Sequence, residues 1–235
     1  CEEYETKIIP TESVIIEKNK TVLLEQKSIE NYIRSNPQMS VQAKINVLNE
    51  RLLGKLENEL TGKSISYTPE EKKELKRSCK VHFGKDEWKG SLFDLYEAFL
   101  KAQRERGSKK FVEQGNYDVY DLAALAYLYK RIKEIDPIRE ASHVIIDEAQ
   151  DFGMMVYNAL AYCLRGCTYT IMGDVSQNIH YGYGLNDWED LRKLILTGAY
   201  DNFGILKKSY RNTVEISEFA TEVLRHGNFP IYPAE

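Results

Sequence analysis

The chain has 235 residues, of which 43% are hydrophobic and 29% charged, values that are typical of a globular protein with a sizeable core. Its formal net charge is −4 at pH 7, which excludes the basic overall surface that many nonspecific nucleic-acid binders have. The sequence has no run of about 18 apolar residues, so we expect no membrane span.

The first part of the chain, residues 1–117, has a mostly helical hydrophobic pattern. Two β-rich runs at residues 14–16 and 21–24 are separated by polar residues and predict a hairpin. From Val41 to Leu60, apolar residues recur every three or four positions, which predicts a helix with one apolar face.

Capping residues predict two more helices in this part. Thr68, Pro69 and Glu71 have the spacing of a capping box with proline at the first helical position. Ser91 is predicted to cap a helix that ends before Gly107. The residues expected to face inward from that helix are Leu92, Leu95, Tyr96 and Phe99.

The second part, residues 118–235, alternates short apolar runs with helical patterns. The residues on one side of its first helix, predicted over 121–135, are Leu122, Leu125, Leu128 and Ile132. Strands are then predicted at 143–146, 168–172 and 203–206. Helices are predicted at 154–164, 187–196 and 213–224. This alternation is typical of a doubly wound α/β domain with a parallel sheet.

Polar residues follow each predicted strand, where ligands bind in open parallel sheets. Asp147 comes first and can hold Mg²⁺ beside nucleotide phosphates, and Glu148 can orient or deprotonate an attacking water. After the second strand, Gly173 permits a tight turn and Gln177 can hydrogen-bond a γ-phosphate. Arg211 follows the third strand and can reach phosphate oxygens. The alternatives are an acidic turn that caps the next helix, an ordinary Gly-Asp turn and a surface arginine.

Three of these segments resemble motifs of UvrD/Rep-like superfamily 1 helicases, and the HelD-like branch is the most similar. Residues 145–151 (IIDEAQD) resemble motif II, residues 173–179 (GDVSQNI) resemble motif III, and residues 209–213 (SYRNT) resemble the motif with the phosphate-contacting arginine. The resemblance covers residues 118–225.

The resemblance implies an α/β fold, a partial RecA-like P-loop NTPase domain with a parallel sheet and flanking helices. Residues 118–235 would be the C-terminal part of the first RecA-like ATPase domain, running into the start of the second. Residues 1–117 would be a mainly helical insertion subdomain with a short N-terminal hairpin. The implied function is a cytoplasmic ATP-dependent DNA helicase or translocase with ATP and Mg²⁺ as cofactors. Its implied partners are single-stranded or duplex DNA and RNA polymerase.

The resemblance also assigns roles to individual residues. It makes Asp147 the Mg²⁺ ligand and Glu148 the catalytic carboxylate. Gln150 and Gln177 would couple the γ-phosphate to motion, and Arg211 would contact that phosphate.

Motif III departs from the family pattern. In the family it usually continues into an aromatic residue that stacks on DNA bases and then an Arg-Gly pair, but here Gly182 and Tyr183 occupy the aromatic and arginine positions. His180, Tyr181 and Tyr183 are the remaining candidates for nucleic-acid contacts, with a purely structural role as the alternative. Asp174 is a further candidate for nucleotide binding.

The sequence lacks a phosphate-binding loop. The tripeptide Gly62-Lys63-Ser64 matches the end of such a loop, but Glu57 occupies the position of its first glycine. We therefore expect the chain to be an internal segment of a longer motor and to hydrolyse no ATP by itself. One alternative is a protein-interaction module, such as a segment that binds RNA polymerase, without motor activity. Cys1 at the start also admits a mature lipoprotein.

The cysteines match no zinc-binding spacing. They are Cys1, Cys79, Cys163 and Cys167. We expect them to be reduced, as is usual in the cytosol.

Overall fold

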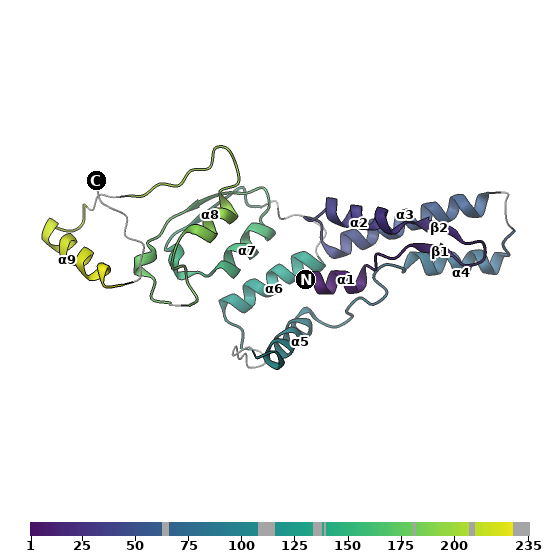
Figure 1. The fold of residues 1–235 in the computed structure, drawn as a ribbon, viewed down its shortest axis with the longest axis horizontal. Helices are drawn as coiled ribbons and strands as arrows, with labels where there is room; N and C mark the ends of the chain where they lie inside the picture. The colour runs from purple at the N-terminus through teal and green to yellow at the C-terminus, as the bar shows by residue number, and fades with distance from the viewer. Residues whose placement is uncertain are drawn as a thin grey trace. The chain divides into compact units, whose positions relative to one another are not determined.

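The computed structural model describes residues 1–62, 66–107, 116–133, 138, 140–180, 182–206 and 210–227. These residues form a mixed α/β structure that is mostly helical, with two small sheets of two strands each (Figure 1). The chain divides into two compact units. The first comprises Cys1–Gln114 and Leu128–Asp136, and the second comprises Gly115–Tyr127 and Pro137–Glu235.

The first unit contains a hairpin and five complete helices within its described residues. They are α1 (Glu2–Ile8), β1 (Val14–Ile16), β2 (Thr21–Leu24), α2 (Gln26–Ser35), α3 (Val41–Thr61), α4 (Pro69–Lys80) and α5 (Leu92–Glu105). Strands β1 and β2 pair antiparallel, which confirms the predicted hairpin.

Helix α3 forms the centre of the first unit's core. Its N-cap, Ser40, accepts a hydrogen bond from the Ala43 N–H at 3.2 Å, which satisfies one of the free backbone donors at the helix start. The predicted apolar face is confirmed, because Leu48, Leu52 and Leu56 are all buried. This face packs against α4 and β2, and its burial contributes to the unit's stability.

The predicted caps of α4 and α5 are confirmed as capping boxes, with Thr68 and Ser91 as the N-caps. The predicted inward face of α5 is wrong at Phe99, which is 53% exposed, whereas Tyr96 and Leu100 are buried. Residues four apart lie on the same side of a helix, so the buried stripe runs through Tyr96 and Leu100 rather than Phe99.

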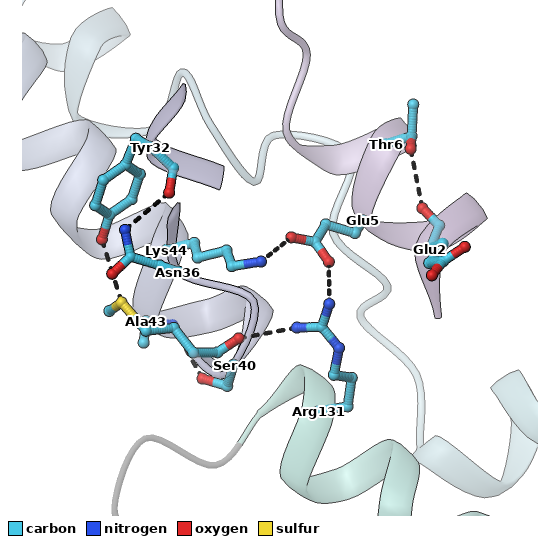
Figure 2. A network of polar contacts seen from close by, with 10 residues as sticks. Glu2, Glu5, Thr6, Tyr32, Asn36, Ser40, Ala43, Lys44 and Arg131 are labelled. Carbon is cyan, nitrogen blue, oxygen red and sulfur yellow. Dashed lines mark hydrogen bonds and ion pairs between the residues drawn. The ribbon is translucent and has the colours of Figure 1, made fainter. Parts of the chain in front are cut away.

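A cluster of buried charges joins three helices of the first unit (Figure 2). Glu5 on α1 accepts a hydrogen bond from Lys44 on α3 and another, at 2.5 Å, from Arg131 near the end of α6 (Val119–Ile132). Arg131 also donates to the backbone carbonyl of Met39 at 2.8 Å. All three charged residues are buried. Removing Glu5 would therefore leave two desolvated cations without a carboxylate.

Within the residues that the structure describes, the second unit contains the start of α6, a parallel pair of strands and three further helices. After α6 come β3 (His143–Ile146), α7 (Met154–Cys163), β4 (Thr168–Ile171), α8 (Glu189–Ile195) and α9 (Val214–Arg225), with two 3₁₀ turns, η1 (Ala149–Asp151) and η2 (Val175–Gln177). Strands β3 and β4 are parallel, as predicted. The inner face of this sheet packs with Tyr157 of α7 and Leu191 of α8.

The third predicted strand, residues 203–206, is wrong. These residues form no strand, and all four are exposed. A strand needs a neighbour for its backbone hydrogen bonds, and an internal glycine, here Gly204, weakens strand formation. Within the described residues the parallel sheet therefore has two strands, not three.

Helix α6 begins two residues earlier than predicted because Asp118 caps it. Asp118 accepts a hydrogen bond from the Asp121 N–H at 2.8 Å, and its own N–H donates to the Asp121 carboxylate at 3.1 Å. Of the predicted apolar face, Leu125 and Ile132 are buried, but Leu122 is 55% exposed. In the described part of the chain, no helix is both long and apolar enough to cross a membrane.

Candidate nucleotide site at the ends of β3 and β4

The ends of β3 and β4 bring the motif II-like and motif III-like segments to one edge. In the parallel register, Ile146 lies opposite Ile171. The pairing continues past the strands, because the Met172 N–H donates to the Ile146 carbonyl at 2.8 Å and the Ala149 N–H donates to the Met172 carbonyl at 2.9 Å. The polar residues that follow both strands therefore start from a shared edge, where ligands bind in open parallel sheets.

Gln150 bridges the two segments. Its amide nitrogen donates to the Glu148 carboxylate at 2.8 Å, and its amide oxygen accepts from the Asp174 N–H at 2.9 Å. The residue is only 2% exposed, so these two bonds satisfy a polar group that would otherwise be costly to bury. A displacement of Glu148 would therefore move the Gln150 side chain, which would in turn shift the backbone N–H of Asp174.

Asp147 and Glu148 are exposed at the start of the first loop. Glu148 has a φ of 51°, in the left-handed region that is unfavourable for residues other than glycine. An Asp147 carboxylate oxygen accepts the Glu148 N–H at 2.9 Å. Strained backbone of this kind is often found at functional sites.

Asp174 organises the second loop. Its carboxylate accepts hydrogen bonds from the Ser176 N–H at 3.0 Å, the Ser176 hydroxyl at 2.6 Å and the Gln177 amide at 2.9 Å. Partial burial acts to raise the pKa of Asp174, but these hydrogen bonds outweigh it and lower the pKa below its ordinary value. The carboxylate thus stays ionised and holds Gln177 in place.

Two glycines make the close approach of these loops possible. A Cβ atom on Gly173 would lie 2.5 Å from the Gln150 amide oxygen, and one on Gly184 would lie 2.2 Å from the Gln150 backbone oxygen. That backbone oxygen accepts the Leu185 N–H at 2.9 Å. Glycine is therefore needed on both sides of the Gln150 segment.

His180 and Tyr183, two of the predicted nucleic-acid contacts, line an open hollow of about 410 Å³ beside the same loops. The other described residues that line it are Asp118, Val119, Tyr120, Asp151 and Phe152. The Tyr120 and Tyr183 rings lie 5.8 Å apart at 31°. Tyr181, the third predicted contact, lies outside the described residues.

Arg211 is not brought into this arrangement by a strand. It is exposed, lies before the N-cap Thr213 of α9 and has no ion-pair partner among the described residues. The expectation that a third strand carries Arg211 to the shared edge is therefore wrong, because that strand does not form. Ser209 of the same motif, and Lys63 and Ser64 of the rejected phosphate loop, lie outside the described residues.

A single carboxylate, that of Asp147, is the candidate Mg²⁺ ligand in this arrangement. No group of three or more His, Cys, Asp or Glu side chains that could hold a metal ion occurs within the described ranges. Mg²⁺ at nucleotide sites needs only one or two carboxylates, since phosphates and water supply its other ligands. Asp147 is exposed and uses one oxygen locally, so its other oxygen can serve.

No protein-family model matches the chain, and no curated protein matches it.

Sequence reasoning missed several residues of this region. Nothing in the local pattern indicated that Gly184 lies against Gln150 or that Tyr120 lies beside Tyr183. One available signal was the spacing of Asp118 and Asp121, which is typical of a helix N-terminus, and which places Tyr120 in the first turn of α6.

Proposed function

We propose that the chain is part of an ATP-driven superfamily 1 motor of the UvrD/Rep-like type. On this proposal the second unit belongs to a RecA-like ATPase domain, and the first unit belongs to a helical insertion. The observation that carries the proposal is the hydrogen-bonded series Glu148–Gln150–Asp174–Gln177 at the shared end of two parallel strands. A motor needs such a series, because hydrolysis at one loop must be communicated to another.

Four residues of the candidate site have distinct tasks in this proposal. Asp147 would hold Mg²⁺, which when bound neutralises charge on the phosphate oxygens. Glu148 would orient the attacking water and accept its proton. Gln177 would sense the γ-phosphate with a neutral amide, and Gln150 would pass a shift at Glu148 on to the second loop.

The remaining assignments rest on the sequence resemblance. Arg211 would contact the γ-phosphate after a rearrangement that brings the segment before α9 to the nucleotide. DNA and RNA polymerase are the proposed partners, and movement on nucleic acid or remodelling of a nucleic-acid-bound complex is the proposed output.

The decisive experiment is Glu148→Gln in the complete protein that carries this chain. An amide can hold a water molecule but cannot accept its proton, so we expect ATP hydrolysis to fall by about 10²-fold or more while nucleotide binding persists. The control is Glu189→Gln, which neutralises an exposed carboxylate on α8. Wild-type turnover in the Glu148 variant would remove Glu148 from the mechanism.

A second measurement uses the chain alone. Because the sequence has no phosphate-binding loop, the purified chain should show no ATP turnover. Measurable turnover at a rate that Glu148→Gln abolishes would contradict the proposed division of the ATP site.

A further inference from the structure

The hollow beside the candidate nucleotide site is lined by acidic and aromatic residues. Asp118 and Asp151 are among its lining residues, and none of the described residues that line it is lysine or arginine. The Asp151 carboxylate accepts no hydrogen bond from any described residue, whereas its backbone carbonyl accepts the Tyr120 hydroxyl at 3.4 Å. The described part of the hollow is therefore acidic.

Aromatic rings supply the rest of its wall. Tyr120 and Tyr183 stand 5.8 Å apart at 31°, and Tyr183 is 65% exposed, so one of its ring faces is available to a ligand. Phe152 adds a third ring. Burial, followed by the negative charges of Asp118 and Asp151, raises the pKa of Tyr120. Both carboxylates thus lie within electrostatic reach of the ring pair.

The walls of the hollow are fixed by close packing. A Cβ atom on Gly153 would lie 2.2 Å from the Tyr183 carbonyl oxygen and 3.1 Å from the Tyr120 ring. The Tyr183 N–H donates to the His180 carbonyl at 2.9 Å. Because the Tyr183 backbone and the Tyr120 ring both lie against Gly153, close packing fixes the positions of these two wall segments, and such preorganisation reduces the cost of binding.

We propose that this hollow binds an arginine side chain presented by a protein or peptide partner. A guanidinium group is a planar cation that stacks on tyrosine and pairs with carboxylates through a fork of N–H donors. The two aspartates repel phosphate, so the backbone of a nucleic acid is a poor occupant. The hollow includes none of the residues proposed to hold ATP. The proposal of an arginine site therefore does not depend on whether the chain is part of a motor.

The test is an NMR titration of the chain with the tripeptide Gly-Arg-Gly and with its neutral counterpart, Gly-citrulline-Gly. We expect saturable shifts of the Asp151 and Tyr183 amides with the arginine peptide and none with the citrulline peptide. Asp151→Asn and Tyr183→Leu should each weaken binding by about fivefold or more. The matched controls, Asp190→Asn and Tyr200→Leu, alter exposed residues outside the hollow and should leave binding unchanged.

Asp118→Asn provides an independent variant that preserves the fold, because asparagine caps helices as well as aspartate does. It removes one charge from the hollow and should also weaken binding. Equal binding of the two peptides, or unchanged binding in both aspartate variants, would overturn the proposal. So would a titration in which oligo(dT) shifts the same amides and displaces the arginine peptide, since the hollow would then be a nucleic-acid contact.

Discussion

Gln150 connects the two loops of the candidate site through both ends of one buried amide. In Gln150→Ala, the Asp174 N–H loses its hydrogen-bond acceptor, the amide oxygen of the buried Gln150. Such a loss costs about 1 to 3 kcal/mol, so exchange of this amide hydrogen should accelerate by about tenfold or more. Gln177→Ala removes an exposed amide and serves as the control, which should leave the Asp174 N–H protected. Equal exchange in the two variants would mean that the bridge contributes nothing.

Asp174 gives the second loop a pH dependence whose sign follows from its lowered pKa. The ionised carboxylate stabilises the loop at pH values above 3.8, the ordinary pKa of the carboxyl group. This stabilisation is lost as the pH falls through the lower pKa that Asp174 has in the folded protein. An NMR titration of the carboxyl carbon should therefore show a midpoint below 3.8. In Asp174→Asn, protection of the Ser176 N–H should no longer depend on pH in this window. A midpoint at or above the ordinary value would refute the role of the three hydrogen bonds.

At the scale of elements, two glycines that look alike in the sequence have opposite roles. Gly54 lies inside α3, and a Cβ atom there would meet nothing within 4 Å. Gly54→Ala should therefore stabilise the first unit by about 0.5 to 1 kcal/mol. Gly184→Ala forces a Cβ atom against the Gln150 carbonyl and should destabilise the second unit by about 1 to 3 kcal/mol. Thermal unfolding checks both, and a shift of the same sign in the two variants would contradict this prediction.

Helices were more predictable from the sequence than the sheet, for a physical reason. The apolar stripe of α3 and the capping boxes of α4 and α5 depend on residues within one or two turns. A strand depends on a partner elsewhere in the chain, so an apolar run such as 203–206 does not suffice. The paired ends of β3 and β4 were predictable because both strands are strongly β-forming and parallel edges align functional loops.

At the scale of the molecule, each unit has its own hydrophobic core. The buried charges of Glu5, Lys44 and Arg131 belong to the first unit alone. Glu5→Gln leaves two buried cations without a carboxylate, which should cost about 3 to 5 kcal/mol. Hydrogen exchange should accelerate in α1 and α3 but not in β3 and β4. Glu17→Gln, which breaks an exposed pair with Lys20, should change little, and equal effects of the two variants would contradict this prediction.

The ring pair in the hollow could not be predicted from the sequence alone. Tyr120 and Tyr183 meet only because Gly153 lets the loop after η2 lie against the start of α6. No local pattern encodes a contact between residues so far apart in the chain. The candidate site was predictable where it follows a strand and unpredictable where it depends on tertiary packing.

The small parallel sheet also affects how the purified chain behaves. Within the described residues, β3 and β4 pair only with each other, so the outer side of each strand presents unshared N–H and C=O groups. Ile145, on β3, is 67% exposed. Edge strands with unpaired backbone groups and apolar side chains act as templates for pairing with further strands. The isolated chain should consequently associate with itself as its concentration rises, and an added strand from another polypeptide should suppress that association.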